Sequence, residues 1–296
     1  MLDSKETEMA KKYVPHLHFA SGEQFFPTTA NYHMERSELW LKSDGTNQLI
    51  DSNPTVTSIS HYTSGDYFLS NRLDSVEEIA EDYNQAREKI GDTVYARVTR
   101  DSLSGNLIVQ YWFFYAFNPG TLNQHQGDWE MIEIILDSTE RPTYAVYSQH
   151  FSGERAIWND VEKVDGTHPR VYVALGSHAS YFKPYQGKLG LESDTVGSRE
   201  EIPWEDLDIL YLGEMGSGKH PATQDWLEYG GRWGNWAELA DIARGAAGPS
   251  GPGHGENEEK WVHPASWGSD LFLVNQSWFM LSWVAYYFLY IFTTII

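Results

Sequence analysis

The pattern of apolar and polar positions along the 296-residue chain is mostly that of β-strands. Residues 107–117 are apolar on both alternating sets of positions, which is typical of a strand covered on both faces. Shorter apolar or alternating stretches between turn signals predict the further strands 14–19, 93–98, 129–136, 144–148 and 170–174. This succession of short strands predicts a mainly β fold. We expect a two-layer antiparallel β-sandwich with added helices, with its core in residues 93–182.

One clear helix is predicted, over residues 75–90. Ser75 and Glu78 form a capping box, and apolar residues then recur at helical spacing. Residues 185–267 are rich in loop-forming residues. We therefore expect one β-sandwich domain over residues 1–267.

The C-terminal end has a different character. Residues 278–296 contain no charged side chain and approach the ~20 residues that a helix needs to cross a bilayer. They predict a C-terminal transmembrane helix within a hydrophobic membrane anchor, residues 268–296, and so a tail-anchored, single-pass membrane protein. A buried core helix or two aromatic strands are the alternatives. Few basic residues flank the segment, so the side of the membrane stays open, and the polar N-terminus is not a secretory signal peptide.

Composition narrows the classes of function. The formal net charge of −21 argues against nucleic acid as a partner, because phosphate binding needs a basic surface. It is typical of a solvated acidic surface, a cation-binding protein or a salt-adapted organism. Cysteine is absent, which excludes disulfides, thiolate metal sites and a cysteine nucleophile. Aromatic residues, at 15%, suit packed strands, a sugar-binding surface or a membrane-facing surface.

The strongest chemical signal is the segment 123–130, Asn-Gln-His-Gln-Gly-Asp-Trp-Glu, at the mouth of a predicted strand. Asp128 and Glu130 are two residues apart and so point to the same face, with His125 on the incoming turn. His150, at the end of another predicted strand, is the fourth candidate ligand. Nitrogen and carboxylate ligands without sulfur suit a divalent cation, and Ca²⁺, Mg²⁺, Mn²⁺ and Zn²⁺ all remain open.

Other polar residues could support these ligands or contact a bound molecule. Ser177-His178 is no nucleophile elbow, because Gly-x-Ser-x-Gly is missing. A metal-activated water with Glu130 or His150 as base would make the protein a metal-dependent hydrolase. Alternatively, the same residues would form a buried hydrogen-bond network that needs no cation. The supporting candidates are Asn118, Trp129, Ser148, His168, Ser177 and His178.

Four short motifs occur in order along the chain: Tyr13-x-Pro15, Glu23-x-x-Phe26-Pro27, Gly127-Asp128-Trp129-Glu130 and Gly176-Ser177-His178-Ala179-Ser180-Tyr181. Together they resemble the vacuolar protein sorting-associated protein 62 family and its uncharacterised prokaryotic relatives, over residues 13–185. This resemblance implies a fold more than a biochemical activity.

A more distant similarity involves the aromatic run 110–115, His125-x-x-Asp128-Trp129-Glu130 and Ser148-x-His150-x-x-Gly153. It is to the necrosis- and ethylene-inducing peptide-like proteins. That family implies a sandwich like those of actinoporins and lectins, a divalent cation held by His125, Asp128 and Glu130, and a role at membrane glycolipids rather than catalysis. Gly127 stands in place of the second histidine of its Gly-His-Arg-His-Asp-Trp-Glu motif, Gln126 replaces the arginine, and the disulfides common there are absent.

These observations predict a membrane-attached, divalent-cation-binding β-sandwich that recognises a glycan or a lipid headgroup at a membrane surface. Its expected partners are the lipid bilayer and that ligand. The metal-dependent hydrolase and the cation-free structural network remain the alternatives.

Overall fold

The computed structural model describes residues 4–43, 46–73, 75–120, 124–149, 152–189, 192–216, 218–235 and 248–274. Its largest sheet, the main sheet, has the strand order β16-β5-β6-β7-β8-β9-β17. Strands β5 to β9 pair antiparallel in chain order, and β16 and β17 are added to the two edges in parallel. The strands are β5 Asp92–Arg100, β6 Leu107–Asn118, β7 His125–Leu136, β8 Pro142–Gln149, β9 Ser152–Ile157, β16 Leu207–Tyr211 and β17 Phe272–Leu273.

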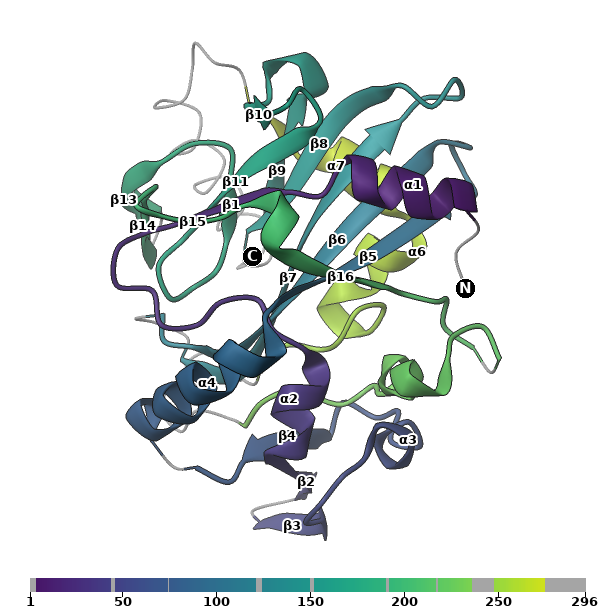
Figure 1. Ribbon diagram of the computed structural model, residues 1–296. Coiled ribbons are helices and arrows are strands. Elements are labelled where there is room, and N and C mark those ends of the chain that lie inside the picture. The colour runs from purple at the N-terminus through teal and green to yellow at the C-terminus, as the bar shows by residue number, and fades with distance from the viewer. Residues whose placement is uncertain are drawn as a thin grey trace, which may run out of the picture.

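A second sheet, the small sheet, forms the other layer (Figure 1). In it β1 pairs parallel with β11 and antiparallel with β15. Leu17 and Phe19 of β1 belong to the same buried cluster as Val109 and Ile132 of the main sheet, so the two layers share one core. The predicted mainly β class is therefore confirmed, whereas three parallel strand pairs differ from the wholly antiparallel arrangement that was predicted. The strands of the small sheet are β1 His16–Phe19, β10 Lys163–Val164, β11 His168–Val173, β12 Ser180–Tyr181 and β15 Glu200–Ile202.

The main sheet is buried on both faces. Every residue of β6 is buried, and Tyr111 and Phe113 belong to the core shared with the small sheet, whereas Trp112 and Phe114 belong to a second cluster. This is the environment that the two-sided apolar pattern predicts. Segments that supply residues to the second cluster or pack near it are α2 Ala30–Glu35, β2 Ser37–Ser43, β3 Thr46–Asp51, α3 Val56–Ile59, β4 Tyr67–Asn71, α6 Glu258–Val262 and α7 Pro264–Asp270.

The predicted helix is α4, Val76–Ile90, at the lower left of Figure 1. Ser75 and Glu78 form the expected capping box, and Tyr83 is buried in the shared core. Gly91 ends the helix with a φ of +68°, a conformation that favours glycine. The remaining elements are α1 Ser4–Lys12, β13 Tyr185–Leu189, β14 Glu192–Val196, and the 3₁₀ helices Trp158–Asp160, Trp204–Asp206, Ala222–Glu228 and Gly255–Asn257.

The prediction of a transmembrane, tail-anchored protein is wrong. Among the residues that the structure describes, no helix has the length and apolar character that crossing a membrane requires. Leu271 is buried, and Phe272–Leu273 pair with Glu154 and Arg155 of β9, so the start of the predicted segment completes an edge of the main sheet. Hydropathy alone cannot distinguish apolar residues that pack against a sheet, as Leu271 does, from apolar residues that contact lipid. Residues 275–296, which hold most of the predicted anchor, lie outside the described residues.

Candidate functional site

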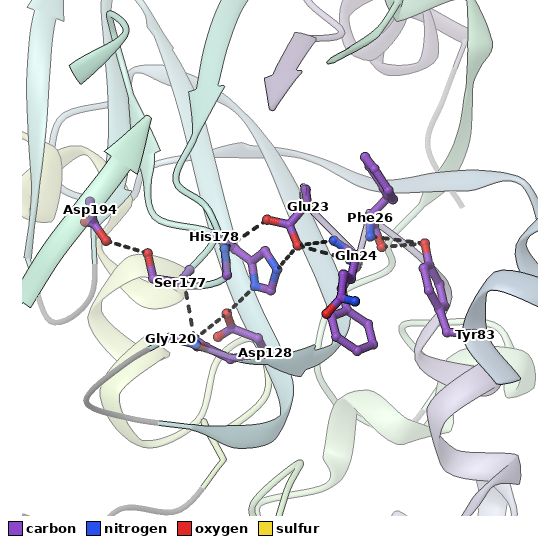
Figure 2. Close-up of polar contacts among 12 residues, drawn as sticks. Glu23, Gln24, Phe26, Tyr83, Gly120, Asp128, Ser177, His178 and Asp194 are labelled. Carbon is purple, nitrogen blue, oxygen red and sulfur yellow. Dashed lines mark hydrogen bonds and ion pairs between the residues drawn. The ribbon is translucent and has the colours of Figure 1, made fainter. Parts of the chain in front are cut away.

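The imidazole of His178 lies between two carboxylates at one end of the main sheet (Figure 2). Its Nδ1 donates to Asp128 Oδ2 over 2.9 Å, and its Nε2 is 3.7 Å from Glu23 Oε1. The ring also stacks on Tyr115, with 3.8 Å between centroids and 1° between planes. His178 and Tyr115 are fully buried, so this end of the sandwich contains a charged group inside its core.

A tight turn between β11 and β12 presents His178 to these partners. The His178 amide donates to the Ala174 carbonyl over 3.1 Å, and His178 itself has a φ of +57°. A positive φ is uncommon for a residue other than glycine, although histidine adopts it more readily than most. Gly176, at φ +73°, donates its amide to Glu23 Oε2, which fixes the turn to the loop after β1. The surroundings thus hold a backbone conformation of some cost.

Hydrogen bonds and charge make this cluster an ion pair network. Burial alone lowers the pKa of His178, but the hydrogen bond to Asp128 and the negative charges of Glu23 and Asp128 outweigh it and raise the pKa to about 9. Burial raises the pKa of Glu23, yet the nearby charge of His178 and hydrogen bonds from the Gly176 and Phe25 amides leave that pKa below its ordinary value. At neutral pH an imidazolium therefore lies between two carboxylates.

Asp128 uses only one of its oxygens in this network. Within the described part of the chain, both of its hydrogen bonds reach Oδ2, from His178 Nδ1 and from Asn118 Nδ2 at 3.0 Å. Oδ1 is left for another partner. Tyr115 is paired opposite Asp128 in the sheet, and its hydroxyl is buried and has no hydrogen-bond partner among the described residues. Burial, followed by the charges of Glu130, Glu23 and Asp128, raises the pKa of Tyr115 well above its usual range.

His125 is held in the form that a metal ligand requires. Its Nδ1 lies 2.8 Å from the Gly127 carbonyl, which can only accept, so Nδ1 carries the proton. In the neutral ring, the lone pair is then on Nε2. Ligating histidines commonly donate their other ring nitrogen to a backbone carbonyl in this way.

Gly127 is a position that no other residue fits. Its φ is +62°, and an added Cβ would lie 2.3 Å from the Trp233 carbonyl oxygen. A histidine there, as in the Gly-His-Arg-His-Asp-Trp-Glu motif, would meet that carbonyl. The difference from the motif is thus a consequence of how residues 232–234 pack against the start of β7.

Glu130 lies two register positions from Asp128, on the same side of β7. In the pairing of β6 with β7, Tyr115 is opposite Asp128 and Phe113 is opposite Glu130. Phe113 and Tyr115 both belong to the core shared by the two sheets. Glu130 accepts a hydrogen bond from the Ser148 hydroxyl, and that hydroxyl accepts from the Met131 amide over 3.0 Å.

The structure brings together some of the sequence-predicted residues and separates others. Among the described residues, the group of three His, Asp or Glu side chains whose ligand atoms all lie within 4.8 Å of one another does not include His125, Asp128 or Glu130. Asn118, Ser148 and His178 contact the carboxylates of the predicted ligand set. Ser177 instead donates to Asp194 over 2.7 Å. His168 donates from Nδ1 to the Val14 carbonyl and stacks on Trp204, so its contacts are elsewhere.

Two further predicted residues need separate mention. Trp129 is on the opposite face of β7, where it packs in the second cluster with Trp226 and Trp233. His150 lies outside the described residues. The fourth candidate ligand thus stays a prediction.

Sequence reasoning missed Glu23 and Tyr115 as members of this site. Glu23 lies in a loop before Phe25-Phe26-Pro27, and nothing near it in sequence indicates an ion pair with a turn 153 residues further on. Tyr115 occurs in an apolar strand, where a tyrosine is typical of packing. Its distinguishing feature, a buried hydroxyl without a partner, exists only in three dimensions.

Fold and site define a two-layer β-sandwich with a buried carboxylate and histidine cluster at one end of its main sheet. The chain belongs to the vacuolar protein sorting-associated protein 62 family, whose profile matches residues 3–238. No curated protein matches the sequence.

Several solved structures of necrosis- and ethylene-inducing proteins are similar at low identity, which confirms the predicted distant similarity. NLPPya in complex with glucosamine has 14% identity over 87% of this chain and 89% of that chain, with a TM-score of 0.41. The non-toxic HaNLP3 protein has 15% identity over 88% and 92%, with a TM-score of 0.42. Necrosis and Ethylene inducing Protein 2, from the causal agent of cocoa's witches' broom disease, has 16% identity over 68% and 72%, with a TM-score of 0.34. Similarity at this level does not identify the ligand of this chain.

Proposed function

We propose that the protein is a divalent-cation-dependent binding protein for a polyhydroxylated ligand, a glycan, and that His125, Asp128 and Glu130 hold the cation. The observation that carries the proposal is the tautomer of His125. Its Nδ1 proton is used on the Gly127 carbonyl, which leaves Nε2 with the lone pair that a metal ion needs. The two hydrogen bonds that Asp128 accepts from the described residues both reach Oδ2. We therefore assign Oδ1 to the cation, together with the carboxylate of Glu130 two residues further along β7.

The balance of charge supports a cation here. Glu23, Asp128 and Glu130 bring three carboxylates into the buried end of the sandwich, and His178 supplies one positive charge. Burial lowers the pKa of Lys260, against the charges of Glu130, Glu256 and Asp128. Buried carboxylates in excess are stabilised by a divalent ion.

Recognition of a sugar through the cation suits the surface better than recognition through aromatic rings. The exposed large hydrophobic side chains in the described residues are all Leu, Ile or Val, whereas the tryptophans that stack, such as Trp129 and Trp226, are buried. A protein-bound Ca²⁺ or Mn²⁺ ion accepts ligand hydroxyl oxygens in its coordination shell. We therefore propose that the glycan is held through its hydroxyl oxygens on the cation.

The alternative of a cation-free hydrogen-bond network explains the part of the cluster around His178. The His178 imidazolium satisfies Glu23 and Oδ2 of Asp128 without a metal ion. It leaves the Tyr115 hydroxyl without a hydrogen-bond partner among the described residues. We therefore assign His178 a structural role beside the cation. The metal-dependent hydrolase stays a prediction of the sequence.

A substitution of His125 tests the cation site. His125→Asn keeps a donor near the position of Nδ1 for the Gly127 carbonyl but removes Nε2. The matched control is His168→Asn, because His168 Nδ1 makes the same kind of bond, to the Val14 carbonyl, outside the cluster. Electron paramagnetic resonance titration of metal-free protein with Mn²⁺ should show a tenfold or greater loss of affinity in His125→Asn and unchanged affinity in His168→Asn. Equal affinity in both variants and the original protein would remove the cation site.

The ligand is tested separately by calorimetry. Glucosamine and mannosamine, which are bound to NLPPya in two of its structures, are suitable first probes. We expect binding of one such sugar with Mn²⁺ or Ca²⁺ present, and its loss when EDTA is added. Sugar binding that persists in EDTA would contradict a role for the cation.

A further inference from the structure

Two histidines and a glutamate gather on the face of the small sheet that points away from the shared core. His16 and His18 are two apart on β1, so both point to this face, whereas Leu17 and Phe19 point into the core. Glu201 of β15 is paired directly opposite His18. None of these residues contacts the cluster around Asp128.

The three side chains have the separations of a preformed metal site. His16 Nε2 is 3.2 Å from Glu201 Oε2, and His18 Nδ1 is 3.3 Å from Glu201 Oε1. One ligand atom from each residue lies within 4.8 Å of the others. His16 and His18 are 7% and 1% exposed, whereas the Glu201 side chain is 47% exposed, so an ion can enter from solvent on the carboxylate side.

An unpartnered nitrogen is the second sign of a ligand. Nδ1 of His18 is buried, lies 3.3 Å from Glu201 Oε1 and makes no hydrogen bond among the described residues. Buried polar atoms are nearly always satisfied by protein, water or an ion. Nδ1 of His18 is thus a buried nitrogen, aimed at the carboxylate, for which an ion would complete the contacts.

Arg170 determines which ring nitrogen of His18 carries the proton when no ion is bound. Its Nη1 lies 2.8 Å from His18 Nε2, and because a guanidinium can only donate, Nε2 accepts. The neutral ring then carries its proton on Nδ1, towards Glu201. A metal ion on Nδ1 requires that proton to move to Nε2, which Arg170 must then leave. Arg170 therefore opposes metal binding in two ways. Its N–H donor stabilises the tautomer in which Nδ1 is protonated, and its positive charge repels the ion.

We propose that His16, His18 and Glu201 form a second divalent-cation site, selective for Zn²⁺, which links β15 to β1. Two imidazoles and one carboxylate are a known ligand set for Zn²⁺, with the fourth position taken by water or a ligand. The hard ions Ca²⁺ and Mg²⁺ prefer oxygen and bind such a set poorly. The site is independent of the one proposed at His125, Asp128 and Glu130.

Variants of Glu201 and Arg170 test this site in the full chain. Zn²⁺ is titrated by calorimetry into metal-free protein, in the original sequence and in the His125→Asn background, so that the first site is not counted. Glu201→Gln should weaken Zn²⁺ binding at least tenfold and abolish the Zn²⁺-induced rise in melting temperature. The matched control is Glu200→Gln, which removes the same charge one residue away on β15 and should change neither.

Arg170→Gln gives a result that a structural role would not produce. A glutamine amide oxygen can accept from His18 Nε2–H, so the variant favours the metal-binding tautomer and removes the competing charge. Zn²⁺ affinity should rise several-fold. Two results overturn the proposal: Zn²⁺ affinity equal in the Glu201→Gln and Glu200→Gln variants, or an unchanged or weaker affinity in Arg170→Gln.

Discussion

At the scale of single residues, the two oxygens of Asp128 differ. Oδ2 accepts from Asn118 and His178, whereas the described residues donate no hydrogen bond to Oδ1, which is the oxygen assigned to the proposed cation. The Asp-Trp-Glu pattern was enough to predict that Asp128 and Glu130 share a face, because strand alternation is local. It could not reveal Glu23, which joins the site through tertiary packing alone.

His178 should make stability depend on pH. Its pKa is raised from 6.5 to about 9 in the folded protein, so its contribution is complete below pH 6.5 and is lost as the pH rises through 9. At about 1.4 kcal/mol per pH unit, the loss is on the order of 3 kcal/mol. His178→Asn keeps a neutral donor for Asp128 and tolerates a positive φ. Urea unfolding from pH 6 to 9.5 should show this decline in the original protein and not in the variant.

The comparison with His178→Asn is needed because Glu133 also titrates in this range. Burial raises the pKa of Glu133 from 4.5 to about 8, so its unfavourable ionisation lowers stability between pH 4.5 and 8 in both proteins. Parallel pH curves for the two proteins would show that the His178 ion pairs do not form.

Gly127→Ala tests the close packing at the start of β7. The new Cβ would lie 2.3 Å from the Trp233 carbonyl oxygen in a backbone conformation of φ +62°. We expect a loss of unfolding free energy of roughly 2 kcal/mol or more. Gly105→Ala is the control, since its φ of +72° carries the same conformational cost with no atom within 4 Å. Equal losses in urea unfolding would show that the contact with Trp233 is unimportant.

At the scale of elements, the strands and helix that the sequence predicts are those whose signal is local. Residues 107–117 appear as β6 and residues 75–90 as α4, because two-sided burial and a capping box leave a direct trace in the sequence. The prediction for the start of the C-terminal apolar segment was wrong. Leu271 packs on the main sheet and Phe272–Leu273 pair with β9, and only the packing partner distinguishes that role from contact with lipid.

Leu271 should be part of the folded domain. It is buried in a cluster with Val146 and Ala265, so Leu271→Ala should lower the unfolding free energy by about 2–3 kcal/mol. Leu273→Ala is the matched control, because Leu273 is 38% exposed and its loss should cost far less. If both variants unfold at the same urea concentration, this segment does not pack on the sheet.

At the scale of the whole molecule, the order of strands is the property least visible in the sequence. β1 pairs with β11 and β16 pairs with β5 across long stretches of chain, both in parallel. These pairings depend on which surfaces complete the shared core, and they carry no local signal. The antiparallel pairing of β1 with β15 likewise places His18 opposite Glu201, and the loop after β1 brings Glu23 against the turn at Gly176.

The overall charge gives a prediction at this scale. The chain has a formal charge of −21 at pH 7, and like charges repel more strongly in the compact state. Raising NaCl from 0.1 to 1 M shortens the screening length from about 10 Å to about 3 Å. The melting temperature should therefore rise with salt, equally in NaCl and KCl. A fall with added salt would mean that attractive surface ion pairs outweigh the repulsion.

The most direct test of the proposed cation site is anomalous diffraction from crystals of the full chain grown with Mn²⁺. We expect a peak bonded to His125 Nε2, with carboxylate oxygens of Asp128 and Glu130 in its coordination shell at the 2.0–2.6 Å typical of hard divalent cations. An anomalous map with no peak at these three residues, at a Mn²⁺ concentration that saturates binding in solution, would contradict the site on which the proposed function depends.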